Sequence, residues 1–252
     1  MVLVFGGTTE GKLVLSALAE KMLPCWYSSK IKIEVELPAN ARYRYGAFTP
    51  QSLEAFCRQE EIRAIVHASH PFAVVLHETV REVSERLGIP VIRYERQYPA
   101  LPEHPLIRYA DSYETLLPEL IAQGFEPVLS LTGVQTIEKW KPFWQHRKMY
   151  CRILPRDTSL VVAAAAGFPE QNLLLSFPGK TVEEEIDVIR QTGAQAIVTK
   201  ESGESGFLSV KADAAITSGV PLYIIRRPAL PPHFIRTDNK NGLLAHLDKL
   251  LS

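Results

Sequence analysis

The feature that most constrains the fold of this chain is the alternation of short apolar runs with segments of helical spacing. The apolar runs are Val2–Phe5, Cys25–Tyr27, Ile62–Val66, Val91–Tyr94, Val128–Leu131, Leu173–Phe177, Ala196–Thr199 and Leu222–Ile225. The helical segments between them include Leu13–Met22, Val74–Leu87, Thr181–Gln191 and Ala212–Ser218. Apolar runs without polar alternation are typical of strands in parallel sheets that helices cover on both faces. The sequence therefore predicts an α/β fold with parallel sheets.

A proline-rich segment indicates where the chain divides. Three prolines fall within Tyr98–Pro105, where they can continue neither a helix nor a central strand. We predict two Rossmann-like domains, an N-terminal domain of residues 1–100 and a C-terminal domain of residues 101–252. Because ligands of such sheets bind at the carboxyl ends of the strands, we expect an active-site cleft between the domains. Within the first domain, Ile31–Glu36 alternates like an edge strand.

The composition excludes several classes of partner. The 252 residues include 28 basic and 28 acidic ones, so no excess charge attracts nucleic acid or an anionic membrane surface. No apolar run approaches the roughly 18 residues that span a bilayer, and the N-terminus does not have the pattern of a signal peptide. The three cysteines are odd in number and lie far apart, which indicates reduced thiols rather than a disulfide framework or a zinc site. We expect a cytoplasmic monomer without a bound metal.

The first apolar run is followed by Gly6-Gly7-Thr8-Thr9-Glu10-Gly11-Lys12 and then by a helical segment. Glycines between a buried strand and a helix often let backbone amides face a phosphate. The stretch is close to the loop that binds nucleoside triphosphates, but Leu13 stands where that loop needs a hydroxyl for magnesium. The run Ile62–Val66 also ends without a carboxylate for the same ion. A P-loop phosphotransferase therefore lacks both magnesium contacts.

A dinucleotide-binding turn is the other interpretation of the same residues. Its requirements are a tight turn, close approach of the backbone and a helix N-terminus, which the glycines can supply. Thr8 and Thr9 add hydroxyls that bind phosphate oxygens or cap the helix. The residues assigned to the cofactor on this interpretation are Gly6, Gly7, Thr8, Thr9, Glu10 and Gly11. The alternative is that the glycines only turn the chain.

The end of the second apolar run discriminates between nicotinamide cofactors. An NAD site usually places an acidic residue there for the ribose hydroxyls, whereas this chain has Ser28, Ser29 and Lys30. Two hydroxyls and a cation suit a 2′-phosphate, so we expect NADPH, with NADH as the other possibility. Alternatively, these are only polar loop residues.

Further motifs stand where other strands are expected to end. They are Val66-His67-Ala68-Ser69-His70-Pro71-Phe72-Ala73, Arg93-Tyr94-Glu95-Arg96, Thr199-Lys200-Glu201-Ser202-Gly203, Lys211 and Arg226-Arg227-Pro228. With the glycine turn, this ordered set resembles the precorrin-6A reductase family of cobalamin biosynthesis. The resemblance implies a reduction, dependent on NAD(P)H, of one ring carbon–carbon double bond in precorrin-6A or its cobalt complex, which gives the 6B product. Glu201 and Glu204 depart from the family pattern.

A tetrapyrrole with several carboxylates needs scattered cations rather than a basic face. The predicted substrate clamps are Arg93, Arg96, Lys211 and Arg227. Guanidinium groups bind carboxylates bidentately and so fix their orientation. The alternative for Arg93 and Arg96 is pairing with Glu95 or with other carboxylates of the protein.

Hydride transfer also requires a proton for the second carbon. His70 is the candidate donor or positioning residue, because imidazole donates near neutral pH; water is the alternative donor. Lys200 and Ser202 complete the predicted catalytic loop, where they would contact a phosphate or a carboxylate. Ser69 belongs with the cofactor-binding residues, since it follows a strand end.

Two rival functions use the same first-half turn. A short-chain dehydrogenase needs Tyr-x-x-x-Lys, and none of the nine tyrosines has a lysine at that spacing. A nucleotide-binding sensor without turnover would keep the turn but would not need the cations of the other motifs.

Overall fold

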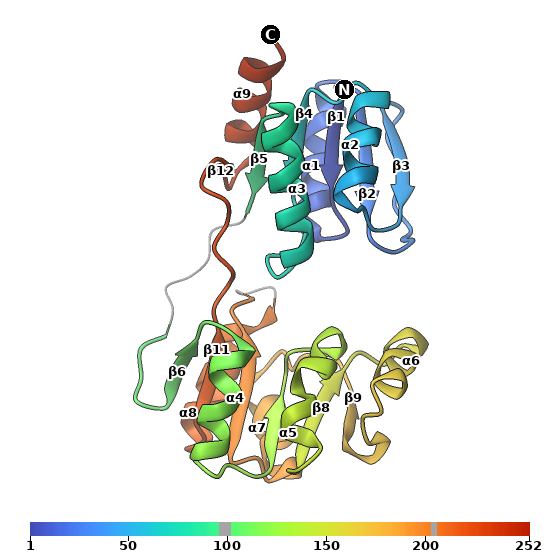
Figure 1. The fold of residues 1–252 in the computed structure, drawn as a ribbon. Coiled ribbons are helices and arrows are strands. Elements are labelled where there is room, and N and C mark those ends of the chain that lie inside the picture. The colour runs from blue at the N-terminus through green and yellow to red at the C-terminus, as the bar shows by residue number, and fades with distance from the viewer. Residues whose placement is uncertain (96–101, 203–205) are drawn as a thin grey trace. The chain divides into compact units, whose positions relative to one another are not determined.

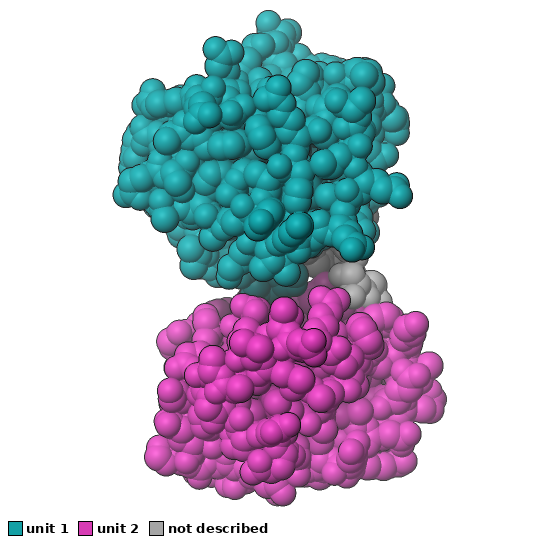
Figure 2. Space-filling model, turned by 90° about the vertical axis from the view of Figure 1, so that its right-hand side faces the viewer, with its two compact units in different colours: residues 1–97, 228–252 teal, residues 98–227 magenta. Residues whose placement is uncertain are grey.

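A computed structural model describes residues 1–95, 102–202 and 206–252 of the chain (Figure 1). The chain forms two compact units (Figure 2). Unit 1 comprises residues 1–97 and 228–252, and unit 2 comprises residues 98–227. The prediction of an α/β fold with two parallel sheets is confirmed, because every strand pair in both sheets is parallel among the described residues.

The sheet of unit 1 has the strand order of a Rossmann fold. Its strands are β1 (Val2–Phe5), β2 (Cys25–Ser29), β3 (Ala41–Tyr45), β4 (Ala64–His67), β5 (Val91–Tyr94) and β12 (Ile235–Thr237). They lie in the order β12-β5-β4-β1-β2-β3, which is 6-5-4-1-2-3 when counted within the unit. The first strand, β1, lies in the middle of the sheet. The next strands, β2 and β3, lie on one side of it, and β4, β5 and β12 lie on the other side. The strand order therefore reverses between β1 and β4, and a ligand of a Rossmann sheet binds at this point.

Helices cover both faces of this sheet. They are α1 (Thr9–Glu20), α2 (Pro50–Gln59), α3 (Val74–Leu87) and α9 (Lys240–Leu251). Successive side chains of β1 point to opposite faces, so Val4 joins a core with α1 and α9, and Leu3 joins the core under α2 and α3. The sheet is thereby buried on both sides, as its apolar strands predicted.

The sheet of unit 2 has a different order. Its strands are β6 (Ile107–Ala110), β7 (Val128–Ser130), β8 (Met149–Ile153), β9 (Leu173–Leu175), β10 (Ala196–Lys200) and β11 (Leu222–Ile225), in the order β6-β11-β10-β7-β8-β9. The α-helices are α4 (Tyr113–Ala122), α5 (Lys141–Trp144), α6 (Asp157–Ala165), α7 (Val182–Thr192) and α8 (Leu208–Ser218). Two 3₁₀ helices are also present among the described residues: η1 (Val134–Trp140) follows β7, and η2 (Glu170–Asn172) directly precedes β9. The reversal of strand order here lies between β7 and β10.

The C-terminal residues differ from the sequence prediction. The sequence predicts that residues 101–252 form one domain, but β12 pairs with β5 and α9 packs on α1, so residues 228–252 belong to unit 1. The physical reason is that β5 would otherwise be an unpaired edge and the apolar face of α1 would be uncovered. The edge strand expected at Ile31–Glu36 is also wrong: that segment has no strand, and the edge is β3.

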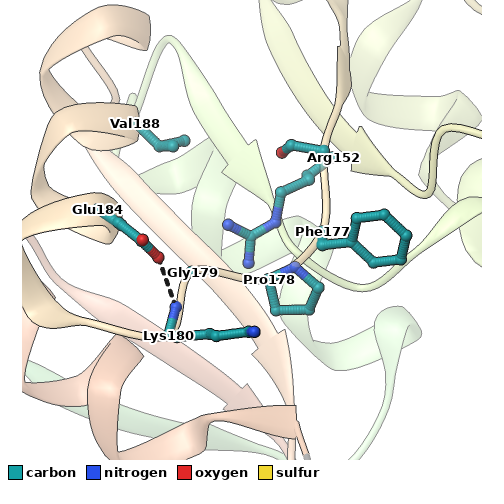
Figure 3. A pocket seen from close by; sticks show the side chains of 8 residues that line it. Arg152, Phe177, Pro178, Gly179, Lys180, Glu184 and Val188 are labelled. Carbon is teal, nitrogen blue, oxygen red and sulfur yellow. Dashed lines mark hydrogen bonds between the residues drawn. The ribbon is translucent and has the colours of Figure 1, made fainter.

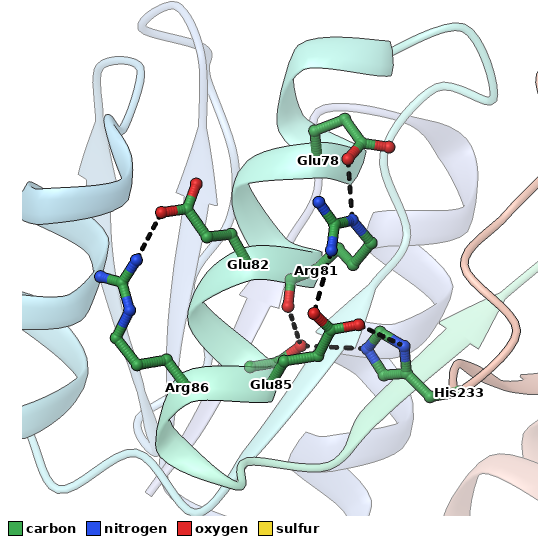
Figure 4. Close-up of polar contacts among 7 residues, drawn as sticks. Glu78, Arg81, Glu82, Glu85, Arg86 and His233 are labelled. Atoms are coloured by element: carbon green, nitrogen blue, oxygen red, sulfur yellow. Dashed lines mark hydrogen bonds and ion pairs between the residues drawn. The ribbon is translucent and has the colours of Figure 1, made fainter.

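The returning segment is held on α3 by His233. Its Nε2 is 3.2 Å from the Ser84 hydroxyl, and its Nδ1 is 3.4 Å from a carboxylate oxygen of Glu85 (Figure 4). Arg81 binds Glu85 and Glu78 on the same helix, as Figure 4 also shows. These contacts attach the segment before β12 to the first unit.

Candidate functional site

The glycine turn joins β1 to α1 at the carboxyl edge of the first sheet. Thr8 is the N-cap of α1: its Oγ1 accepts a hydrogen bond from the Gly11 amide at 3.1 Å and donates one to the Ala68 carbonyl at 2.6 Å. Of its two predicted uses, the structure shows helix capping. The second bond ties the turn to the loop after β4. The turn therefore lies at the reversal point between β1 and β4.

Tyr27 explains why the turn needs its glycines. A Cβ on Gly6 would lie 2.2 Å from atoms of the Tyr27 ring, and a Cβ on Gly11 would lie 2.6 Å from the Gly6 Cα. The Tyr27 hydroxyl accepts the Gly7 amide at 2.9 Å, while Gly7 itself has a φ of 86°, which glycine adopts without strain. The glycines thus permit close packing of turn, helix and second strand, which is one of their roles in a dinucleotide fold.

The end of β2 brings one of the predicted cofactor residues, Ser28, next to a cation that sequence reasoning missed. The Ser28 hydroxyl accepts a hydrogen bond from Arg44 at 2.8 Å, and the Arg44 guanidinium lies 3.7 Å from the centroid of the Phe48 ring. Ser29 donates to the Ile31 carbonyl at 2.6 Å. Lys30 is exposed. Arg44 comes from β3, so only the pairing of β2 with β3 reveals that it stands beside Ser28.

A buried polar network joins the ends of β4 and β5. Arg93 is only 1% exposed; its NH1 is 3.2 Å from both the Nδ1 and the carbonyl oxygen of His67. The other side of its guanidinium binds Glu95 at 3.1 Å. Ser69 Oγ is 3.1 Å from the same His67 Nδ1. Of the two alternatives for Arg93, the structure shows the pairing with Glu95. Its predicted partner in the clamp, Arg96, lies outside the described residues.

Two further histidines lie near this network. His70 is exposed in the loop between β4 and α3, and its Nδ1 accepts the Phe72 amide at 3.2 Å. His77 on α3 is buried, with its ring centroid 4.9 Å from that of His67. Burial, and secondarily Arg93, lower the pKa of His77 to about 4 and hold the pKa of His67 well below 6.5. His67 and His77 are therefore neutral at physiological pH, and only the exposed His70 has access to a ligand.

In unit 2, the predicted lysines lie at or behind the carboxyl edge of the sheet. Lys200 ends β10, and Lys211 on α8 is buried and donates to the Gly206 carbonyl. Burial is the main cause that lowers the pKa of each lysine to about 8. Ser202 follows in the β10 loop. Arg227 is held by Glu201, which accepts its Nε at 2.8 Å and its backbone amide at 3.0 Å.

A buried ion pair adjoins Lys211. Arg152 at the end of β8 binds Glu185 of α7 at 2.9 Å, and both side chains are almost inaccessible. Arg152 also lines a pocket of about 400 Å³ together with Phe177, Lys180 and Glu184 (Figure 3). Sequence reasoning missed Arg152, although the run Met149–Ile153 with one internal arginine resembles β5. The charged groups around Lys211 thus include the cations Arg152 and Lys200 and the carboxylate of Glu185.

Three further features are the thiols, two aromatic residues of unit 2 and the absence of membrane helices among the described residues. The three cysteines are free and buried, as reduced thiols would be. Trp140 and Phe143 are completely buried and pack on each other with ring centroids 6.2 Å apart, so they belong to the core. In the part of the chain that the structure describes, no helix combines the length and apolar character needed to cross a membrane.

A Rossmann-ordered sheet with a glycine turn at its reversal point, followed in the chain by a second parallel sheet, places this protein in the class of two-unit α/β proteins with Rossmann-like folds. The particular family follows from its relatives. Residues 1–248 match the family described as precorrin-6x reductase CbiJ/CobK, and the chain belongs to this family. It is therefore an oxidoreductase, and the family implies a reduced nicotinamide cofactor in general.

Individual relatives agree with this assignment. The chain is 30% identical to a cobalt-precorrin-6A reductase of Synechocystis, over 94% of this chain and 92% of the relative. It is also 30% identical to a precorrin-6A reductase of Rhodococcus erythropolis, over 99% of this chain and 98% of that one. A solved structure, CobK precorrin-6A reductase, matches 99% of this chain and 96% of its own with a TM-score of 0.73 at 20% identity, which shows the shared fold.

Proposed function

We propose that this protein uses NADPH to reduce one ring carbon–carbon double bond of precorrin-6A or of its cobalt complex, giving the corresponding 6B product. The observation that carries the proposal is the glycine turn at the reversal point of a Rossmann sheet, in a chain whose family is named for precorrin-6x reduction. Relatives that cover most of this chain are named for the metal-free and for the cobalt-containing substrate.

The residues of unit 1 fit a dinucleotide. The N-terminus of α1 has a partial positive charge that favours a pyrophosphate, and Gly6, Gly7 and Gly11 leave the backbone of the turn without side chains. Arg44, Ser28 and Lys30 supply donors for a 2′-phosphate at the end of β2. These groups favour NADPH over NADH, since neither Asp nor Glu occurs in β2.

The residues of unit 2 fit an anionic substrate. Lys200 and Lys211 are cations in positions where burial weakens solvent screening, and Arg152 is a further buried cation, which binds Glu185. Burial makes the charged form of a lysine costly, as the lowered pKa values of Lys200 and Lys211 show. A carboxylate of the substrate would offset this cost.

When bound, the nicotinamide supplies the hydride, and the protein supplies orientation and a proton. Arg93 is almost inaccessible and holds the loop after β4 through His67, so we assign it to positioning rather than to direct contact with substrate. His70 is exposed in that loop and retains its proposed role as proton donor, with water as the alternative. Lys200, with a pKa of about 8, is a further group that carries a transferable proton near neutral pH.

Anaerobic turnover tests the proposal. The purified protein is mixed with NADPH and either precorrin-6A or its cobalt complex, and the loss of nicotinamide absorbance is followed together with the product mass. We expect NADPH oxidation that depends on the tetrapyrrole and a product heavier by two hydrogens. Tight NADPH binding without any oxidation would instead support the nucleotide-binding sensor.

A matched pair of variants tests the substrate side. Lys211→Met should raise the KM for the tetrapyrrole and leave the Kd for NADPH nearly unchanged, since the buried lysine lies in unit 2. Lys148→Met is the control, because Lys148 is exposed at the opposite, amino end of the same sheet. Equal effects of the two substitutions would contradict the proposed carboxylate site.

A further inference from the structure

The loop after β4 places Ser69 beside the glycine turn. The preceding residue, Ala68, accepts the hydrogen bond from Thr8, and its amide binds the Phe5 carbonyl at 2.9 Å. Ser69 is 9% exposed, so it lies at the border between the buried network and the surface. What Ser69 can offer a ligand depends on the direction of its hydroxyl proton.

Arg93 determines which nitrogen of His67 carries a proton. A guanidinium has only donors, so an imidazole nitrogen that is hydrogen-bonded to it must be an acceptor. The Arg93 NH1 group is 3.2 Å from His67 Nδ1, and its second hydrogen is directed to the His67 carbonyl, also at 3.2 Å. His67 is fully buried and neutral, so its single ring proton is on Nε2.

The tautomer of His67 in turn orients Ser69. The Ser69 Oγ is 3.1 Å from the same Nδ1, which has no proton to donate. Ser69 and His67 can therefore form a hydrogen bond only if the Ser69 hydroxyl is the donor and Nδ1 is the acceptor. A hydroxyl has one proton, so the remaining bonding capacity of Ser69 Oγ is that of an acceptor.

We propose that Ser69, oriented by the positioning residues Arg93 and His67, acts as a hydrogen-bond acceptor that recognises an N–H or O–H donor in the nicotinamide riboside half of the cofactor. The donor is the carboxamide amino group or a ribose hydroxyl of this half: phosphates lack protons to give at neutral pH, and the adenosine half is assigned to the end of β2, which lies on the other side of β1 from β4. This assignment rests on the proposed function. It gives Ser69 a role different from that of the phosphate-binding turn, which it adjoins.

The tautomer is tested first, on the unliganded protein. Two-dimensional ¹⁵N–¹H spectra of protein labelled at histidine distinguish a protonated ring nitrogen from an acceptor one. We expect the His67 signals, identified by their loss in His67→Asn, to show a protonated Nε2 and an acceptor Nδ1 without titration between about pH 6 and pH 8. A proton on Nδ1 would overturn the proposal, because Ser69 would then be free to donate to a phosphate.

Ligand binding tests what Ser69 recognises. Ser69→Ala should weaken NADPH binding roughly three- to tenfold, the usual range for one neutral hydrogen bond. The same substitution should leave the affinity for 2′-phospho-ADP unchanged, because this fragment keeps the phosphates but lacks the nicotinamide riboside. Equal losses for both ligands, or none for either, would overturn the assignment. Ser159→Ala, at a buried serine of unit 2, is the control.

A cofactor analogue separates the two donors. The 3-acetylpyridine analogue of NADPH lacks the amide N–H but keeps the ribose hydroxyls. If the effect of Ser69→Ala disappears with this analogue, the donor is the carboxamide; if it persists, the donor is a ribose hydroxyl. Both results support an acceptor at Ser69.

Substitution of His67 tests its positioning role. The side-chain oxygen of His67→Asn can replace Nδ1 as the acceptor for Arg93 and Ser69, whereas His67→Leu cannot. We expect the Asn variant to retain more of the preference for NADPH over 2′-phospho-ADP than the Leu variant; the same preference in both would contradict this role. If the unaltered protein failed to bind NADPH, the proposed function would fail, while the spectra would still decide the tautomer.

Discussion

At the scale of single residues, the structure separates cations that are already paired from those placed to meet a ligand. Arg93 binds Glu95 at the end of its own strand, β5, and Arg227 binds Glu201, which follows the neighbouring strand β10. Arg44 instead binds the neutral Ser28 hydroxyl and the face of an aromatic ring. Because Arg44 contacts only neutral groups among the residues that the structure describes, its charge is available for an anion.

Arg44 should therefore govern the choice between cofactors. Arg44→Ala should weaken NADPH binding roughly 10- to 100-fold, the range for a hydrogen bond to a charged group, and should change NADH binding little. Titration of both cofactors by fluorescence measures the difference. Arg42→Ala is the control, since Arg42 precedes Arg44 on the same strand and lies near Trp26 and Glu60. A similar loss for both cofactors would contradict a 2′-phosphate site here.

The lysines of unit 2 predict a pH dependence. The pKa values of Lys200 and Lys211 are lowered to about 8, so both side chains are mainly charged at pH 7 and mainly neutral at pH 9. The KM for an anionic tetrapyrrole should rise as the pH passes through about 8. Steady-state kinetics between about pH 6.5 and 9.5 test this, and Lys200→Arg with Lys211→Arg should move the rise to higher pH.

The same lowered pKa values also make the stability of the fold depend on pH. Substrate affinity should fall as the pH rises, whereas the lysines' contribution to the free energy of unfolding should increase. An unfolded lysine has a pKa of about 10.4, so between pH 8 and that value the unfolded state binds more protons than the folded state. The contribution of these lysines to the free energy of unfolding therefore rises with pH in this window.

The two effects of pH are measured separately. A flat or rising affinity for the tetrapyrrole over the same pH window would contradict the assignment of these lysines to the carboxylate site.

At the scale of elements, local pattern predicted what lies within one helix or strand. The predicted helix Val74–Leu87 has the observed bounds of α3, and the predicted strands Val2–Phe5 and Val91–Tyr94 are β1 and β5. The alternation at Ile31–Glu36 was misleading because Ile33 and Val35 pack on the core from an irregular segment. α9 completes the same core with Leu243, Leu244 and Leu247.

Because α9 packs on the core of unit 1, shortening a side chain on its buried face should lower the free energy of unfolding strongly. Leu247 is fully buried in the core with α1, so Leu247→Ala should lower the free energy of unfolding by about 2–5 kcal/mol. Lys249→Ala, on the exposed side of the same helix, should change it by less than about 0.5 kcal/mol. Urea denaturation followed by circular dichroism measures both. Equal stabilities would show that α9 does not support unit 1.

At the scale of the whole molecule, unit 1 is discontinuous in sequence and unit 2 is one uninterrupted segment. Residues 228–252 supply β12 and α9, which contribute an edge strand to the first sheet and part of its core. The proposed cofactor groups all belong to unit 1, whereas Lys200, Lys211 and Arg152 belong to unit 2. Binding of cofactor and turnover are therefore separable properties.

Excision of unit 2 tests this separation. A shortened chain in which residues 1–95 are joined to 228–252 by a flexible glycine–serine linker should fold and bind NADPH within a few-fold of the full chain. It should not oxidise NADPH in the presence of tetrapyrrole. Calorimetric titration and the anaerobic assay measure the two properties. A second shortened chain that ends at residue 95 is the comparison and should be less stable, because the edge of β5 and the apolar face of α1 are uncovered. Loss of NADPH binding in a folded joined chain would contradict the placement of the cofactor groups.

The sequence by itself determined the class of the fold and the turn at its first crossover. Non-alternating apolar runs specify strands buried on both faces, and glycines specify where backbone must approach closely; both are local properties. Only the tertiary structure decided that β12 returns to the first sheet, that Arg44 stands beside Ser28, and that Arg93 is buried against His67. These outcomes depend on which strands become neighbours, and that choice is made by burial and edge pairing between segments far apart in the chain.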